Sequence, residues 1–444
     1  MTGGTMTTRP PADRWSSWQT MDSGRLLLIS VAAMLVVAAF ATTTIAVHQH
    51  GVQMKTALAF GGFIALGELL RLALPGGREA APIAMVGGMS YALLLHVQGT
   101  PGGGTHPVAQ TSEAAQALLV IAVAAIGMMV GALPHIAAGR DAGLTGMCTR
   151  LIAIACVAFI FRTALVGFVM RLSWEWAFAA MASLVLLGWL VETVTSALIR
   201  ADDVRARFSV AIVDEMRVQW PLGAAVGASV IITVFGAEIM GLAELAVFLG
   251  PLLVTQVAFR RDAKIRATYL QTVRSLARVT EVAGYVEAGH SRRVSRLAVA
   301  VGRELGMHER DLLQVEYAAL MHDIGQLSLR DPIPGGATVL VSAADQQRIA
   351  ELGAEVIREA GVLEEVAELV RCQSWPAQGH NPDPPIGSMI IRAANTFDDL
   401  VGASTDRERS ATALDRMRLD PIGYDSHVVV ALTEVAGRRL AWRL

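Results

Sequence analysis

Long apolar runs fill the first part of the chain, and short periodic apolar stripes fill the rest. Up to about Phe259 the runs carry few charges, whereas Arg, Glu and Asp become frequent after it. A membrane-spanning helix needs about 20 mostly apolar residues. The pattern therefore predicts a polytopic region of transmembrane helices followed by a region of soluble character.

Six of the apolar runs have the length of one span, and a seventh is about twice as long. The single spans are predicted at Arg25–Val47, Val52–Leu74, Ala81–Val97, Glu113–Leu133, Cys148–Met170 and Trp174–Ile199. The long run is Trp220–Phe259, and a break near Gly236-Ala237-Glu238 would divide it. The runs therefore predict about eight spans, with seven as the alternative.

Arginine and lysine side chains fall in alternate loops between these runs. They occur in the N-terminal tail, in the even-numbered loops and in FRRDAKIR after the last run. Arg140 and Arg150 are assigned to one of these even-numbered loops. The loop GTPGGGTHPVAQTS has none. Because cytoplasmic loops carry the excess of these residues, eight spans place both chain ends in the cytoplasm, at the plasma membrane. Seven would put FRRDAKIR outside.

Some ionisable residues fall within or beside the predicted spans. They are Glu68, Arg162, Glu192, Glu238 and Glu244. Ionisable groups inside a membrane are costly and are candidates for a ligand or ion site. Near the end of a span, such a side chain can instead reach the headgroups.

The region after Phe259 shows apolar residues at helical spacing throughout. In 260–285 the stripe is formed by Ile265, Tyr269, Val273, Leu276, Val279 and Val282. This linker helix could pair with the same helix of a second chain, as a homodimer, or pack on its own domain. The expected organisation is a tail at 1–24, membrane helices at 25–259, the linker, and a cytoplasmic domain at 286–444. The expected fold class is all-α.

Composition adds little to this division. The formal net charge is −2, and no basic face that would indicate a nucleic-acid partner stands out. The three cysteines form no Cys-x-x-Cys motif and are too scattered for a disulfide framework.

Candidate chemistry is concentrated in one dipeptide of the polar part. His322 and Asp323 end an apolar helical run, and His290 lies upstream in GHSRRVSRLA. Imidazole nitrogen and carboxylate oxygen suit divalent metals such as Mn²⁺, Fe²⁺ or Zn²⁺. A bound metal makes a nucleophile from water at neutral pH and also holds a phosphoryl oxygen. A buried polar cluster without metal is the alternative.

Four stretches carry a resemblance to a known family. They are GHSRRVSRLAVAVGRELGM, AALMHDIGQLSLRDPI, TFDDLVGASTDRERS and LDPIGYDSHVVVAL. From about Tyr269 to Ala436 the chain resembles the HD superfamily of metal-dependent phosphohydrolases. It is most similar to the HD-GYP branch, whose members hydrolyse cyclic di-GMP. The resemblance implies an all-α domain and a nucleotide phosphoester as substrate, and it does not cover the membrane part.

The chain departs from the HD-GYP pattern at several ligand positions. Ile349 stands where the family has a histidine, Arg371-Cys372-Gln373 replaces His-His-Glu, and Asn395 replaces an aspartate. Gln326 stands where a lysine would help to neutralise phosphate. These losses remove the second and third metal positions of the family.

The resemblance leaves a reduced site. His290, His322 and Asp323 would hold one metal, and Asn395 or Asp398 would complete the set. His322 and Asp323 would be the catalytic pair. Gln326 and Arg371 are the candidates for contacting the phosphate of a nucleotide. Three functions remain open: a phosphohydrolase in signal transduction, an inactive nucleotide-binding or protein-interaction module, and a carrier or channel regulated by the domain.

Overall fold

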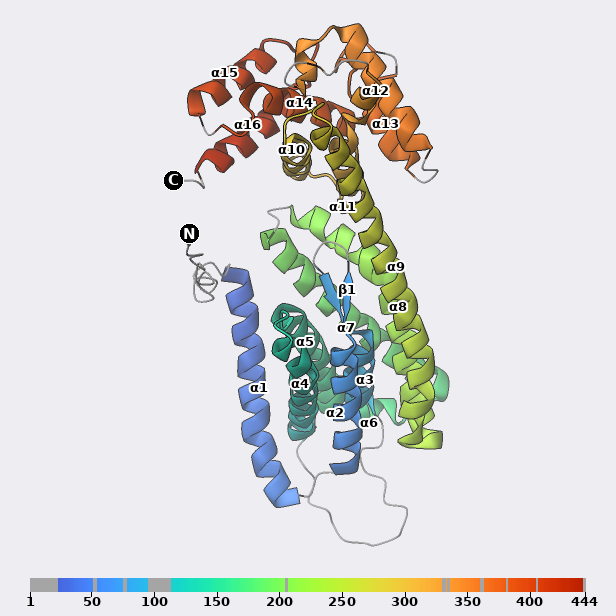
Figure 1. The fold of residues 1–444 in the computed structure, drawn as a ribbon. Coiled ribbons are helices and arrows are strands. Elements are labelled where there is room, and N and C mark those ends of the chain that lie inside the picture. The colour runs from blue at the N-terminus through green and yellow to red at the C-terminus, as the bar shows by residue number, and fades with distance from the viewer. Residues whose placement is uncertain are drawn as a thin grey trace, which may run out of the picture. The chain divides into compact units, whose positions relative to one another are not determined.

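The computed structural model describes residues 23–50, 54–74, 78–94, 113–203, 207–329, 333, 336–359, 363–380, 382–404 and 406–441. The chain divides into two compact units (Figure 1). The N-terminal unit comprises Met1–Val204 and Glu215–Arg260, and the C-terminal unit comprises Arg205–Asp214 and Arg261–Leu444. Most of the expected tail and the loop GTPGGGTHPVAQTS lie outside the described residues.

Apolar helices build the N-terminal unit. They are α1 Ser23–His50, α2 Met54–Leu69, α3 Pro82–Leu93, α4 Glu113–Ala137, α5 Leu144–Ile160, α6 Val166–Val169, α7 Trp174–Asp203, α8 Phe208–Met240 and α9 Ala243–Val282. Helices α8 and α9 each extend beyond this unit into segments of the other. A short π-helical segment, Phe161–Leu165, joins α5 to α6.

The core of this unit forms where α4 packs against α1, α2 and α5. Figure 1 shows α1, α2 and α4 running alongside one another. The predicted second span ends earlier than expected, because the chain turns into a short antiparallel hairpin of β1 Leu72–Leu74 and β2 Arg78–Ala80. Leu72 pairs with Ala80 in this hairpin. Among the described residues it is the only strand pairing, so the predicted all-α class is confirmed.

Six described helical segments are long and apolar enough to cross a membrane. Helices α2 and α3 coincide with two further predicted spans but have only 16 and 12 residues, fewer than the roughly 20 that a span needs. The count of eight therefore stays a prediction. The long apolar run does break in two, between the end of α8 at Met240 and the start of α9 at Ala243.

A buried ion pair lies within the N-terminal unit. Both carboxylate oxygens of Glu68 accept hydrogen bonds from Nη2 of Arg150, at 2.9 and 2.7 Å. Both side chains are almost fully buried. Arg150 therefore does not belong to a solvated loop, as its assignment to the even-numbered loops supposed. It lies in α5, where Glu68 compensates its charge.

Amphipathic helices build the C-terminal unit. They are α10 His290–Glu304, α11 Glu309–Met321, α12 Ala343–Arg358, α13 Glu364–Cys372, α14 Ile386–Val401, α15 Arg407–Arg418 and α16 Ser426–Ala441. Helix α10 packs against α11, α14 and α16, and α12 packs against α13. Two 3₁₀ helices, Ile324–Ser328 and Thr338–Leu340, lie between α11 and α12.

Local sequence explains how these helices start and which face they bury. The Ser342 hydroxyl accepts a hydrogen bond from the Asp345 backbone amide and caps α12, and the Asp406 carboxylate caps α15 in the same way. In α14 the buried residues recur at helical spacing, which places that helix in the core.

The predicted linker stripe divides into buried and exposed parts. Val273 is buried in the core of the C-terminal unit, whereas Ile265, Leu276, Val279 and Val282 are exposed. Helix α9 runs without interruption from Ala243 to Val282. The linker helix therefore packs on its own domain with only part of its apolar stripe. The homodimer stays a prediction.

Candidate metal centre

His290 is positioned by the start of α10. The residue before it, Gly289, has φ of +82°, a left-handed conformation that glycine adopts without a steric penalty. This turn allows α10 to begin at His290, and the histidine side chain is buried. Buried apolar residues of α10, such as Val294 and Leu297, anchor the same helix in the core.

His322 and Asp323 are positioned by the end of α11. His322 is the first residue after the helix, and the following residues turn into the 3₁₀ helix Ile324–Ser328. The backbone carbonyl of His322 accepts a hydrogen bond of 2.8 Å from Gln373 Nε2, which ties this turn to the end of α13. Both His322 and Asp323 are almost fully buried.

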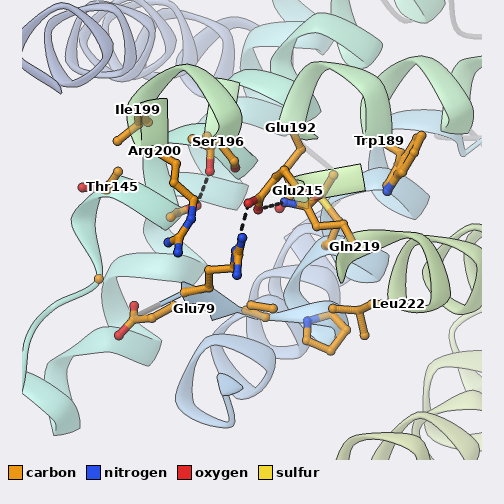
Figure 2. A pocket seen from close by; sticks show the side chains of 18 of the residues that line it. Glu79, Thr145, Trp189, Glu192, Ser196, Ile199, Arg200, Glu215, Gln219 and Leu222 are labelled. Atoms are coloured by element: carbon orange, nitrogen blue, oxygen red, sulfur yellow. Dashed lines mark hydrogen bonds and ion pairs between the residues drawn. The ribbon is translucent and has the colours of Figure 1, made fainter. Parts of the chain in front are cut away.

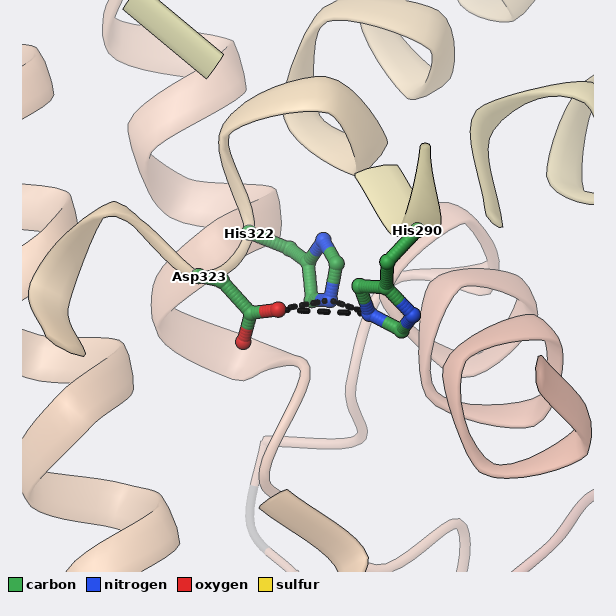
Figure 3. Close-up of side chains that lie close together, drawn as sticks. All are labelled: His290, His322 and Asp323. Carbon is green, nitrogen blue, oxygen red and sulfur yellow. Dashed lines mark hydrogen bonds and ion pairs between the residues drawn. The ribbon is translucent and has the colours of Figure 1, made fainter. Parts of the chain in front are cut away.

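Three side-chain atoms from these two helix ends converge on one point (Figure 3). His322 Nε2 lies 3.0 Å from Asp323 Oδ2, and His290 Nε2 lies 3.3 Å from the same oxygen. The two Nε2 atoms are 3.4 Å apart. The structure thus brings together the three residues that the sequence predicted as a metal set.

The hydrogen bonds on the far side of each ring fix the tautomers. His322 Nδ1 lies 2.8 Å from the carbonyl oxygen of Ala319, and His290 Nδ1 lies 2.8 Å from Asp398 Oδ2. Both partners only accept, so each Nδ1 carries the proton. When a ring is neutral, its lone pair is therefore at Nε2, which faces the other ring and the Asp323 carboxylate. Histidines that ligate a metal typically donate their other ring N–H to a carbonyl or carboxylate oxygen in this way.

The electrostatics of this cluster favour a cation. Asp323 Oδ2 is buried and has no hydrogen bond of good geometry among the described residues. Burial works against the charged forms of His290 and Asp323. The carboxylates of Asp323 and Asp398, close to its two ring nitrogens, nevertheless raise the pKa of His290 to about 10. The two histidines hold the pKa of Asp323 well below its usual range. A positive charge is therefore stabilised at the point of convergence, and either a proton on His290 Nε2 or a metal ion in its place would supply it.

The spacing of the three atoms fits one divalent metal. Ligand atoms about 2.1 Å from a single metal lie about 3.0 Å apart in octahedral geometry and about 3.4 Å apart in tetrahedral geometry. The three separations are 3.0, 3.3 and 3.4 Å. His290, His322 and Asp323 therefore have the donor types and the spacing of a metal site.

Asp398 and Asn395, the two candidates for completing the set, occupy different places. Asp398 contacts Nδ1 of His290, on the side of the ring away from Asp323, and also accepts from Arg293 Nε at 2.9 and 3.1 Å. This carboxylate therefore orients His290. Asn395 donates to Thr338 Oγ1 at 2.9 Å, and its Oδ1 is buried without a partner among the described residues. Asn395 thus has a free acceptor.

The turn after Asp323 is held by a backbone contact with α12. A Cβ placed on Gly325 would lie 2.0 Å from the carbonyl oxygen of Ile349 and 2.8 Å from the amide nitrogen of Gly353. Only glycine permits this approach. The Ile349 side chain is buried and borders the same space as His322 and Asp323. An apolar group therefore lies beside the site, where the resemblance leads one to expect a further ligand.

Comparison with known proteins identifies the domain that holds this cluster. Residues 288–400 match the family model described as HD domain. The C-terminal unit contains an HD domain. The match includes every predicted metal ligand, from His290 to Asp398, and confirms the predicted combination of apolar N-terminal helices with a C-terminal, all-helical HD domain.

One solved structure and the curated proteins complete the comparison. The crystal structure of a cyclic GMP-AMP specific phosphodiesterase from V. cholerae (V-cGAP3) aligns at 16% identity. The alignment covers 91% of this chain and 97% of the other, with a TM-score of 0.24. No curated protein matches the chain.

A cavity of about 210 Å³ opens beside the candidate metal ligands of the HD domain. His322, Asp323 and Asn395 border it, together with polar side chains that the sequence did not single out. These are Gln346, Gln373, Ser374, Arg392, Thr396, Arg416 and Tyr424. The cavity therefore places two guanidinium groups near the candidate metal ligands.

Arg392 and Tyr424 contact each other in the wall of this cavity. The guanidinium group of Arg392 lies 5.4 Å from the centre of the Tyr424 ring and donates to the carbonyl oxygen of Ser374. The Tyr424 hydroxyl lies 3.1 Å from Thr396 Oγ1. The stretch LDPIGYDSHVVVAL, which supported the family resemblance, contains Tyr424, but nothing in its pattern marked this residue as part of a site.

Gln326 and Arg371, the predicted phosphate contacts, do not border this cavity. Gln326 is fully buried, and its Nε2 lies 3.4 Å from the carbonyl oxygen of Gly336. Arg371 forms an ion pair with Glu368 on the same helix, and its guanidinium lies 4.6 Å from the centre of the Trp375 ring. Trp375 in turn stacks on His380 at 3.7 Å. Arg371 therefore contacts the loop after α13 through Trp375.

Proposed function

We propose that this chain is a membrane-bound signalling protein whose HD domain hydrolyses a nucleotide phosphoester, such as cyclic di-GMP, with a divalent metal. The observation that carries the proposal is the convergence of two imidazole lone pairs and one buried carboxylate oxygen at 3.0–3.4 Å. The HD domain match supports a phosphohydrolase.

His290, His322 and Asp323 would hold the metal, which when bound supplies a nucleophile from water at neutral pH and polarises a phosphoryl oxygen. Asp398 and the Ala319 carbonyl orient the two rings, so that both Nε2 atoms face the same point. Arg293 neutralises part of the Asp398 charge. Asn395 offers an amide oxygen, which is a weaker donor than the carboxylate of the family pattern.

The cavity would take the phosphoester itself. Arg392 and Arg416 suit phosphate because a guanidinium donates two parallel hydrogen bonds to its oxygens. The cavity is smaller than the roughly 300–1,000 Å³ of most small-molecule pockets. It therefore suits one phosphodiester with its adjoining sugar, and the rest of a dinucleotide would lie outside it.

The membrane part of the proposal rests on the apolar helices of the N-terminal unit. Six of them could span a bilayer, and the arginine-bearing loops would then face the cytoplasm together with the HD domain. The exposed apolar residues of α9, such as Val279 and Val282, leave a surface for pairing with a second copy. The N-terminal unit would sense or localise, and the HD domain would respond.

Metal content tests the proposal most directly. The full-length protein, purified in detergent and incubated with Mn²⁺, Fe²⁺ or Zn²⁺, is expected to retain close to one metal per chain by elemental analysis. The His322→Ala and Asp323→Ala variants are expected to lose it. His427→Ala is the matched control, because His427 is exposed and lies outside the cluster. Equal metal in the wild type and in both site variants would contradict the proposed site.

Turnover separates the enzyme from the alternative, an inactive binding module. Cyclic dinucleotides and bis(p-nitrophenyl) phosphate are the substrates to test with the metal-loaded protein. Hydrolysis that disappears in Asp323→Ala would support the phosphohydrolase. A binding module would instead retain metal and bind a cyclic dinucleotide, but would hydrolyse none of the substrates with Mn²⁺, Fe²⁺ or Zn²⁺.

A further inference from the structure

A second and larger cavity lies entirely within the N-terminal unit. Its volume is about 580 Å³, inside the range that holds most small-molecule ligands. Residues of α1, β2, α3, α5, α7 and α8 line it (Figure 2). The HD domain contributes no residue to this cavity.

The cavity has an apolar part and a polar part. Met85, Met89, Val185, Leu222 and Val226 line the apolar part. The polar part contains an ion pair between Arg78 and Glu215. Glu215 accepts from Arg78 Nε at 2.9 Å and from Gln219 Nε2 at 2.5 Å.

Glu192 is a polar residue of this cavity whose charge has no partner in contact with it among the described residues. It lines the cavity wall on α7, beside Glu215 and Gln219 (Figure 2). Unlike Glu215, its carboxylate makes no hydrogen bond or ion pair with another described residue. It lies within electrostatic range of two residues that are already paired: Arg150, which favours its charged form, and Glu215, which opposes it. A partly buried carboxylate without a partner is costly unless a cation or a donor from outside compensates it.

Trp189 lies one helical turn before Glu192 on the same wall. Its Nε1 is buried without a hydrogen-bond partner among the described residues. An indole ring beside a carboxylate is a favourable environment for an ammonium group, because the ring face attracts cations and the carboxylate accepts hydrogen bonds. The apolar part of the cavity then has room for the rest of a ligand.

We propose that this cavity binds a protonated amine with an apolar body, whose ammonium group pairs with Glu192 while its body contacts Met89, Val185 and Val226. Two sources have this chemistry: a free amphipathic amine and the headgroup of an aminolipid such as phosphatidylethanolamine. The proposal concerns a site separate from the HD domain, and its failure would leave the metal centre unaffected.

Binding of octylamine to the full-length protein tests the site. The protein is placed in phosphatidylcholine nanodiscs, and saturable binding of labelled octylamine is measured by equilibrium dialysis with empty nanodiscs subtracted. The amine is protonated at pH 7, since amines of this kind have a pKa near that of lysine, about 10.4. Octanol and octanoate, which have the same apolar chain, are expected to compete at least ten-fold more weakly.

Two variants locate the binding. Glu192→Gln keeps the shape of the side chain and removes its charge, and it is expected to weaken octylamine binding at least ten-fold. Glu113→Gln is the matched control, because Glu113 is exposed and does not line the cavity; it should bind as the wild type does. The comparison among octylamine, octanol and octanoate uses only wild-type protein, so it stands even if Glu192→Gln folds poorly.

Nanodiscs that also contain phosphatidylethanolamine distinguish the two sources. Reduced octylamine binding in them would assign the site to the lipid headgroup, and unchanged binding would assign it to a free amine. Three outcomes would overturn the proposal: no saturable binding, equal competition by octanol and octylamine, or undiminished binding to folded Glu192→Gln.

Discussion

Glu68 in the N-terminal unit and Asp323 in the C-terminal unit are both buried carboxylates, yet their surroundings differ. Glu68 meets the guanidinium of Arg150, so positive and negative charge lie in contact within the unit. Asp323 meets the lone-pair side of two imidazole rings, whose protons are used elsewhere. In the first arrangement the two charges compensate each other, whereas in the second the carboxylate faces two ring nitrogens that can both serve as metal ligands.

The difference indicates how a structural charge can be told from a functional one. A buried pair of opposite charges explains its own presence, and removal of one partner leaves the other uncompensated. A cluster of acceptors is stabilised by a cation, and hydrogen bonds on the far side of each ring would then orient its ligand atom. Substitutions in the two regions should therefore affect different measurements, stability in one and metal affinity in the other.

The largest effect is expected at the buried pair. Glu68→Ala should lower the free energy of unfolding by about 3–5 kcal/mol, because Arg150 would stay buried without its partner. Equilibrium unfolding of the full-length protein in detergent measures the change. The double variant Glu68→Leu/Arg150→Met should recover most of the loss. A double variant as unstable as the single one would show that the pair does more than balance charge.

A smaller effect, on a different quantity, is expected at the metal centre. Asp398→Ala removes the acceptor that orients His290 and should weaken metal binding by about 10–100-fold. A titration against a coloured chelator measures the affinity. Asp415→Ala, on the exposed face of α15, is the control and should bind metal as the wild type does. Unchanged affinity in Asp398→Ala would mean that His290 needs no such support.

The smallest effect is expected where an ion pair is exposed. Arg310 and Glu365 lie 3.5 Å apart at the surface of the C-terminal unit, with most of both side chains exposed. Arg310→Ala should change the free energy of unfolding by less than about 0.5 kcal/mol, because water and salt screen the pair. Unfolding in denaturant checks this. If Arg310→Ala lowered the free energy of unfolding about as much as Glu68→Ala does, buried and exposed ion pairs would not differ as proposed.

The convergence of the three candidate metal ligands was predictable from the sequence because these residues lie where periodic apolar patterns begin or end. His290 opens one amphipathic helix, and His322-Asp323 closes another. Residues at helix ends in a packed domain can meet, and the family resemblance named which ones. The helical class followed from the same periodicity.

The contacts between distant residues were not predictable from one sequence. Glu68 and Arg150 are 82 positions apart, and no local pattern links them. Arg392 and Arg416 carry no motif, and an arginine on an amphipathic helix is usually solvated. Their place beside His322 follows from how α14 and α15 pack. The hairpin after α2 was missed because its first strand, Leu72–Leu74, continues an apolar run.

The contact between Gly325 and Ile349 indicates which positions near the candidate metal ligands can change their side chain during evolution. The close approach uses the Ile349 carbonyl oxygen, which every amino acid possesses, and the absence of a side chain on Gly325. The backbone around His322 and Asp323 therefore places no demand on the side chain at position 349. A ligand at position 349 could be exchanged for isoleucine while His322 and Asp323 keep their positions. A side chain at position 325 would instead displace both His322 and Asp323.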